Sequence, residues 1–330
     1  MMNGRKTGMT KKVYLDQNHW INLLRARKGL SNDTEIQNVL QNIIKASNEG
    51  TAFFPISNIH LMETYKKRNP VKRDEMLDFM IEVSQGYAIV PYINIQNFEI
   101  RQAVLKQVGL PYKNVIQYVI GKGIPYIMGK KPEIINKDGN RPEFPKDLQD
   151  KIREAIYDIE AFKLCVKNNE YIKAVREHLT RERALVKKIE NRIKRDMDFV
   201  KDKKLRKEFT LLRLFQEIII PEMEKVAKEL CLDPWEIMPP NVSKKRVYDF
   251  IQNIPSLYTS WILQFRRDVQ CQGKIKPSDI NDIAALSMAI PYCDIVVTEN
   301  MWADIAKKEK LVQLYNTTIL DSLSGLNKYL

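Results

Sequence analysis

Short segments rich in β-branched and aromatic residues constrain the fold of this 330-residue chain more than any other feature. Each is followed by a helical pattern, in which apolar residues recur every three or four positions. The predicted strands are Lys12–Asp16, Thr51–Ile56, Tyr87–Tyr92, Ile295–Thr298 and Leu311–Tyr315. Strands that alternate with helices form a parallel sheet with helices on both faces, so the sequence predicts an α/β fold.

The helices between these strands are marked by apolar spacing and by capping residues. Asp33–Asn48 has apolar residues at helical spacing and ends before Gly50. Ser57 or Asn58 is expected to cap the helix that carries Glu63. Further helices are predicted at Asn18–Lys28, Val71–Ser84, Ser278–Ile290, Trp302–Lys308 and Asp321–Leu330.

Between residues 96 and 270 the strand signals nearly vanish, and long charged helical patterns replace them. Gly121–Phe144 is rich in Gly, Pro and Lys and is predicted to be an exposed loop. The helices expected here are Asp147–Asn168, Glu170–Val200, Leu205–Leu230 with a break at Pro221, Val242–Ile254 and Ser256–Gln270. The predicted organisation is therefore a core formed by residues 12–95 and 271–330, an all-helical insertion at 96–270, and a flexible basic tail at 1–11.

The composition favours a nucleic-acid partner in a reducing compartment. The formal net charge of +13 points first to nucleic acid and second to an acidic membrane, with solubility alone as the alternative. No apolar run approaches the roughly 20 residues of a membrane span, and no apolar stretch follows the basic N-terminus. The four cysteines form no CxxC pair and the three histidines are dispersed, so neither a disulfide framework nor a zinc site is expected. These features predict a cytoplasmic protein without a membrane partner.

Four carboxylates follow the predicted strands or lie in the first turns of the next helix. They are Asp16, Glu63, Asp282 and Glu299. The carboxyl ends of parallel strands and the starts of the following helices share one edge of a sheet, so we expect these side chains to converge. Four carboxylates repel one another unless a divalent cation neutralises them. The sequence therefore predicts a Mg²⁺ or Mn²⁺ site, for which the simplest chemistry is phosphodiester hydrolysis.

Each of these acids has a structural alternative when it is taken alone. Asp16 could serve only as a helix cap or a turn residue, and Glu63 could be a solvent-facing helix residue. Asn300 is a neutral oxygen donor that could hold a water on the metal, and it competes with Glu299 for the last position of the site.

Three further residues are auxiliary candidates for the site. His60 shares a helix face with Glu63, although a polar helix residue is the simpler interpretation. Asp279 suits the cap of its helix. Asp294 starts the strand that Glu299 ends, so it is expected to be a turn residue.

The segments VYLDQNHW, SNIHLMET, NDIAALSMA and IVVTEN together resemble the PIN domain, part of a wider group of PIN-like and flap-endonuclease-like metallonucleases. The resemblance covers somewhat under half of the chain, in its two end blocks. It implies a three-layer α/β/α core, one or two Mg²⁺ or Mn²⁺ ions, and cleavage of a phosphodiester, usually in RNA, by a metal-activated water. The long helical insertion is absent from minimal PIN toxins.

A basic helix is the second functional signal. Residues 171–208 contain fourteen Lys and Arg against seven Asp and Glu. Their net charge of +7 is over half of the chain's net charge of +13. A common stripe at helical spacing is formed by Arg181, Lys188, Arg192 and Arg195. Such a stripe can follow a phosphate backbone, although a solvated face crossed by ion pairs is equally compatible with the pattern.

These signals predict a divalent-metal-dependent nuclease, most simply an endoribonuclease acting on RNA rather than DNA. A non-catalytic nucleic-acid-binding or scaffold protein with a PIN-like core is the alternative. A phosphoryl hydrolase acting on small molecules is a third interpretation, which the basic helix disfavours. A toxin, an RNA-processing enzyme and a defence effector are all compatible settings, and a homo-oligomer or a protein partner stays open.

Overall fold

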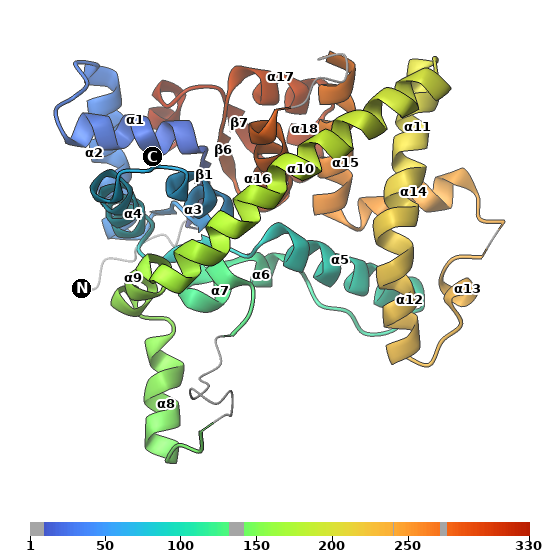
Figure 1. Ribbon diagram of the computed structural model, residues 1–330, viewed down its shortest axis with the longest axis horizontal. Helices are drawn as coiled ribbons and strands as arrows, with labels where there is room; N and C mark the ends of the chain where they lie inside the picture. Colours follow the sequence, from blue (N-terminus) through green and yellow to red (C-terminus); the bar gives the residue numbers. More distant parts are fainter. Residues whose placement is uncertain (1–9, 132–141, 240, 271–275) are drawn as a thin grey trace, which may run out of the picture. The chain divides into compact units, whose positions relative to one another are not determined.

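The computed structural model describes residues 10–131, 142–239, 241–270 and 276–330 (Figure 1). The chain divides into two compact units. The first comprises Met1–Val90, Ile120–Arg176 and Tyr292–Leu330, and the second comprises Pro91–Val119 and Glu177–Pro291. Most of the predicted tail at 1–11 and part of the predicted loop Gly121–Phe144 lie outside the described residues.

The first unit contains a four-stranded parallel sheet with the strand order β2-β1-β6-β7. Its strands are β1 (Lys11–Leu15), β2 (Ala52–Phe53), β6 (Ile295–Val297) and β7 (Thr318–Leu320). In the centre of the sheet Leu15 lies opposite Val297, and Val297 lies opposite Leu320. Because β1 and β6 end in register, the residues that follow them emerge side by side.

A second sheet of the same unit has the order β3-β4-β5. It consists of β3 (Ile56–Ser57), β4 (Tyr87–Ile89) and β5 (Ile120–Lys122), and only the β4–β5 pair is antiparallel. The single strand predicted at Thr51–Ile56 is therefore two short strands in different sheets. Phe54 and Pro55 separate them.

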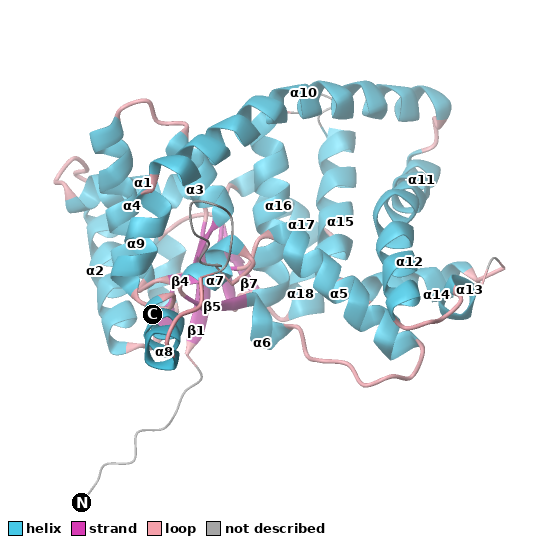
Figure 2. Ribbon diagram, turned by 60° about the horizontal axis from the view of Figure 1, so that its bottom comes forward, coloured by secondary structure: helices cyan, strands magenta, loops and turns pink. Residues whose placement is uncertain are grey.

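Helices cover both faces of the parallel sheet, whose strands lie side by side (Figure 2). The helices of this unit are α1 (Gln17–Arg27), α2 (Thr34–Glu49), α3 (Asn58–Tyr65), α4 (Pro70–Ser84), α7 (Ile124–Met128), α8 (Lys146–Ala155), α9 (Ile159–Lys167), α17 (Asn300–Lys308), α18 (Leu311–Tyr315) and the 3₁₀ helix η2 (Ser324–Lys328). Val13 and Leu15 pack in one core with Trp20 of α1 and Ile43 of α2. On the opposite face Tyr14 stacks on His60 of α3. Period-two alternation along β1 thus buries both faces.

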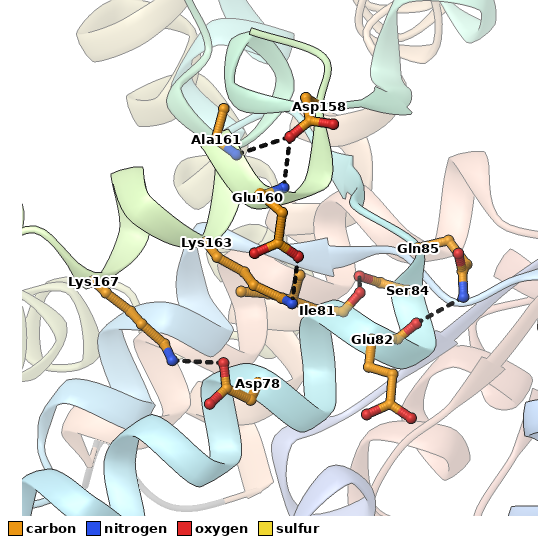
Figure 3. Close-up of polar contacts among 10 residues, drawn as sticks. All are labelled: Asp78, Ile81, Glu82, Ser84, Gln85, Asp158, Glu160, Ala161, Lys163 and Lys167. Atoms are coloured by element: carbon orange, nitrogen blue, oxygen red, sulfur yellow. Dashed lines mark hydrogen bonds and ion pairs between the residues drawn. The ribbon is translucent and has the colours of Figure 1, made fainter. Parts of the chain in front are cut away.

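The helix α9 belongs to the first unit and packs against α4 (Figure 3). Asp158 caps α9 by accepting hydrogen bonds from the backbone nitrogens of Glu160 (2.8 Å) and Ala161 (3.1 Å). Lys167 forms an ion pair with Asp78 of α4 at 2.5 Å. The cap at Asp158 also explains why the single helix predicted at Asp147–Asn168 is two helices.

Gly123 is required where β5 turns into α7, which provides a test of this packing. Its φ is +93°, and an added Cβ would lie 2.5 Å from the carbonyl oxygen of Ile156 and 2.6 Å from the Cα of Tyr157. We expect Gly123→Ala to lower the free energy of unfolding by roughly 2–3 kcal/mol, because strained backbone and a close contact add. Chemical denaturation would measure this loss.

The matched control is Gly29→Ala, where φ is +67° and nothing lies within 4 Å of the added Cβ. It carries the backbone strain without the contact, so its loss should be smaller, at about 1 kcal/mol. Equal losses in the two variants would show that the contact at Gly123 contributes nothing.

Among the described residues of the second unit, the regular elements are all helices. Its elements are α5 (Tyr92–Gln107), α6 (Ile116–Val119), most of α10 (Asn169–Phe199), α11 (Lys203–Leu214), the π-helical turn η1 (Phe215–Ile219), α12 (Ile220–Glu229), α13 (Pro234–Ile237), α14 (Lys244–Gln252), α15 (Pro255–Gln270) and all but the last residue of α16 (Pro277–Tyr292). The break predicted at Pro221 is a widened turn within a helix, because Pro221 cannot donate to the carbonyl of Glu217. Among the described residues, no helix has both the length and the apolar character needed to cross a bilayer.

Several predicted boundaries are wrong. Leu311–Tyr315 is the helix α18, and the last strand is Thr318–Leu320, where the β-branched Thr318 and Ile319 follow Asn316 in the left-handed conformation. Residues 120–176 belong to the first unit rather than to the predicted helical insertion, since β5 in this segment pairs with β4. Residues 276–291 belong to the helical unit rather than to the core.

Candidate functional site

Asp16 lies at the carboxyl end of β1, where it caps α1. Its Oδ1 accepts a hydrogen bond from the backbone nitrogen of Gln17 (2.7 Å), and its Oδ2 accepts one from Thr298 Oγ1 (3.2 Å). Its own backbone nitrogen donates to the carbonyl oxygen of Val297 at 3.0 Å. Two hydrogen bonds therefore fix this carboxylate, and a third fixes its backbone, at the junction of the two central strands.

Glu299 follows the neighbouring strand and caps α17 without a side-chain hydrogen bond to that helix. Instead, its Oε1 accepts a hydrogen bond from Asn18 Nδ2 of α1 at 2.6 Å. Asn300 is the first residue of α17 and is exposed. The β1–α1 and β6–α17 junctions thus hold each other through Asp16–Thr298 and Asn18–Glu299.

Glu63 brings a third carboxylate to this edge from the second turn of α3. Gln17 of α1 lies against the same helix, because its Nε2 donates to Thr64 Oγ1 at 3.2 Å. Burial raises the pKa of Asp16 to about 6, and the nearby carboxylates of Glu63 and Glu299 add to the increase. The structure therefore places Glu63 and Glu299 close enough to Asp16 to raise its pKa. These are three of the four predicted acids.

Two buried acceptor atoms in the first turn of α1, which follows Asp16, have no hydrogen-bond partner among the described residues. They are Gln17 Oε1 and His19 Nε2, and both side chains are at least nine-tenths buried. The His19 ring hydrogen-bonds to the backbone of Thr298, while burial lowers its pKa and keeps it neutral. Buried acceptors without donors are costly, and they suit a site that a hydrated cation occupies.

The remaining predicted residues occupy other positions. Asp282 lies in the second turn of α16, in the second unit, and its place in the site stays a prediction. Asp279 forms a buried ion pair with Arg267 and accepts from the backbone nitrogen of Lys276 at 2.6 Å. Asp294 accepts from the backbone nitrogen of Lys12 at 2.7 Å, at the opposite end of β6 from Glu299.

His60 is also committed to protein contacts, since both of its ring nitrogens are hydrogen-bonded within the first unit. Within the described ranges, no three His, Cys, Asp or Glu side chains lie close enough together to hold a metal ion as they stand. Any cation here would therefore complete its ligand set with other oxygen donors, such as Asn300 or water.

Sequence reasoning missed Gln17, Asn18, His19 and Thr298, which surround the acids. Their positions in the sequence could have indicated that they belong to this site. Three of them fill the first turn after Asp16, and Thr298 directly precedes Glu299. Polar residues in the first turn after a strand face the same edge as the acid that ends the strand.

The basic stripe differs from the predicted one. Arg192 is half-buried and pairs with Glu217 at 3.3 Å, so it is less available to a phosphate than the exposed residues of the stripe. Lys188 and Arg195 are exposed as predicted, and Lys187 and Lys194 are exposed beside them. The side chain of Arg181 lies outside the described residues. The exposed basic face of α10 is therefore Lys187, Lys188, Lys194 and Arg195.

A cavity of the second unit is apolar, and none of Asp16, Glu63, Asp282 and Glu299 lines it. It measures about 660 Å³ and lies among α11, η1, α12, α13 and α14. Phe209, Phe215, Trp235 and Tyr248 line it, and two of its polar residues, Lys244 and Glu208, pair with each other. Without converging polar groups that await a substrate, it is a poor candidate for a phosphodiesterase site.

No family model, curated protein or solved structure matches this chain.

Proposed function

We propose that this protein is a divalent-metal-dependent nuclease with a PIN-like core, and that it hydrolyses phosphodiesters, most readily as an endoribonuclease. The observation that carries the proposal is the grouping of Asp16, Glu63 and Glu299 at the carboxyl edge of β1 and β6, where burial and mutual repulsion raise the pKa of Asp16 to about 6. Strongly perturbed carboxylates at such an edge are typical of functional sites.

The residues at this edge fit a hard divalent cation. Carboxylate, amide and water oxygens are the ligands that Mg²⁺ and Mn²⁺ prefer, and Mg²⁺ usually keeps several of its waters. Asp16, Glu63 and Glu299 would hold the ion, with Asn300 as a further oxygen donor. Gln17 Oε1 and His19 Nε2 would accept hydrogen bonds from its waters. The bound ion would provide a water of lowered pKa and neutralise charge that develops on the phosphate.

The protein's own groups would orient this chemistry. Thr298 Oγ1 and the backbone nitrogen of Gln17 leave Asp16 little freedom to rotate, and Asn18 fixes one oxygen of Glu299. Hydrogen bonds that orient metal ligands in this way commonly determine affinity and rate. No nucleophilic side chain is needed, so we expect direct attack by water and no covalent intermediate.

The exposed basic face of α10 supports nucleic acid as the substrate. Lys187, Lys188, Lys194 and Arg195 present four positive charges on one helix. Repeated Lys and Arg on one face bind phosphates through charge and counterion release. The same face would serve a binding protein without catalytic activity, which is the second candidate function.

Cleavage of end-labelled single-stranded RNA tests the proposal directly. We expect internal cuts that require Mn²⁺ or Mg²⁺, stop with EDTA and leave a DNA strand of the same sequence less affected. Binding of the RNA without any cleavage, across all these ions, would instead support the non-catalytic function.

The pKa of Asp16 predicts how metal binding depends on pH. A proton and a cation compete for this carboxylate, so the affinity for Mn²⁺ should fall about tenfold for each pH unit below 6. Above pH 7 the affinity should change little, because Asp16 is then ionised. Calorimetric titrations with Mn²⁺ between pH 5 and 8 would measure this, and an affinity that is constant from pH 5 to 7 would contradict it.

A further inference from the structure

His60 joins the two elements that carry Asp16 and Glu63. It is 1% exposed and lies in the first turn of α3. Its Nδ1 accepts a hydrogen bond from the backbone nitrogen of Ser57 at 3.0 Å, and its Nε2 lies 2.9 Å from the carbonyl oxygen of Leu15. A backbone N–H can only donate and a carbonyl can only accept, so Nδ1 is unprotonated and Nε2 carries the proton.

The ring is also fixed by its neighbours. It stacks on Tyr14 with a centroid distance of 5.1 Å and meets the edge of Trp20 at 6.3 Å. Burial lowers the pKa of His60 to about 4, so the neutral form that makes both hydrogen bonds persists at ordinary pH. The imidazole is therefore a permanent link rather than a titrating group.

The two ends of this link adjoin the candidate acids. Leu15 directly precedes Asp16, and His60 lies one helical turn before Glu63 on α3. No ring nitrogen is left for a cation or a phosphate, because both are engaged. What remains for His60 is to set the position of α3, and with it Glu63, relative to the end of β1.

We propose that His60 is a positioning residue, which holds α3 and its Glu63 against the end of β1 so that Glu63 and Asp16 can share a divalent cation. This inference rests on the proposed function. Partners that orient metal ligands typically change metal affinity by 10–100-fold when they are lost.

Three variants separate positioning from general stability. In His60→Gln the amide oxygen can accept from Ser57 and the amide nitrogen can donate to Leu15, so both hydrogen bonds survive. His60→Asn can reach Ser57 but is too short to reach Leu15. Ser57→Ala removes a hydroxyl that accepts from the His60 backbone nitrogen at 3.4 Å and lies 3.4 Å from His60 Nδ1. This weakens the helix cap but keeps the two backbone hydrogen bonds that link the imidazole to Ser57 and Leu15.

The experiment is a calorimetric titration with Mn²⁺, together with kcat and KM for RNA cleavage and a thermal melt of each variant. We expect His60→Asn to lower Mn²⁺ affinity and kcat by 10–100-fold with little change in KM. His60→Gln should remain within about threefold of wild type. Ser57→Ala should melt at a lower temperature while it keeps the wild-type Mn²⁺ affinity.

The outcomes distinguish this inference from the function on which it rests. Mn²⁺ binding that is present in wild type and unchanged in His60→Asn would overturn the positioning role alone. An affinity loss that merely follows the melting temperature, in Ser57→Ala as well as His60→Asn, would also overturn it. If His60→Asn does not fold, a His60→Gln variant that folds but loses Mn²⁺ affinity would do the same. Wild-type protein that binds no Mn²⁺ would overturn the proposed function, and the inference with it.

Discussion

Replacing Asp16 by Asn should abolish cleavage, with a fall in rate of about 10³-fold or more, while RNA binding is retained. The substitution removes a negative charge that Glu63 and Glu299 repel and that would hold the cation. It keeps the fold, because Asn is a good helix cap and its side-chain oxygen can still accept from the backbone nitrogen of Gln17. Cleavage of labelled RNA and calorimetry with Mn²⁺ would measure the two losses.

Although Asp16→Asn should abolish activity, we expect it to increase the stability of the fold. The folded-state pKa of Asp16, about 6, lies above the ordinary value of 3.8, so its ionised form destabilises the fold. This penalty is fully present above pH 6 and disappears as the pH falls toward 3.8. Asp16→Asn should therefore stabilise the protein at pH 8, by roughly 1–3 kcal/mol once solvent screening of this half-buried group is allowed for.

Asp294→Asn is the matched control for Asp16→Asn. It makes the same chemical change at the other end of β6, where the carboxylate accepts a hydrogen bond from the backbone nitrogen of Lys12. We expect it to leave cleavage and Mn²⁺ affinity near the wild-type values. If Asp16→Asn retains both activities to the same extent as Asp294→Asn, Asp16 is a helix cap and nothing more.

The α/β class and the parallel pairing of β1 with β6 could be predicted from the sequence, because these strands are short β-branched runs bounded by polar residues. The acid that ends each of them follows from the same pattern. Leu311–Tyr315 has comparable apolar content but forms a helix, since a five-residue apolar run does not distinguish the two states. Tertiary pairing with β4 decided that residues 120–122 form a strand, and no local signal revealed it.

The groups around the acids were harder to predict than the acids themselves. His19 and Thr298 matter through where their atoms point, and sequence spacing gives only the edge of the sheet to which they belong. For Arg192, in contrast, the sequence predicted a role that its contacts in the structure do not favour. Its spacing places it on a basic stripe, but it is half-buried and pairs with Glu217, which lies on a different helical element.

Changing Lys187, Lys188, Lys194 and Arg195 together to Ala should weaken RNA binding and flatten its dependence on salt. All four side chains are exposed on α10, whereas Val186 and Ile193 of the same helix are buried, so the variant should keep its packing. Each phosphate contact contributes about 0.7 to the slope of log affinity against log salt for a single strand. Losing four contacts should therefore reduce the slope by roughly 3 units, as measured by fluorescence anisotropy across a salt series.

A second quadruple variant distinguishes direct phosphate contacts of the α10 face from the general effect of net charge on RNA binding. Four other exposed lysines of the same unit are Lys225, Lys228, Lys244 and Lys245. Changing these to Ala removes the same total charge, so any long-range attraction falls equally in both variants. If the basic face of α10 contacts the phosphates, only its own variant loses about 3 units of slope, and both variants keep wild-type Mn²⁺ affinity. Equal slopes in the two variants would mean that α10 presents an ordinary solvated face and that the RNA binds elsewhere.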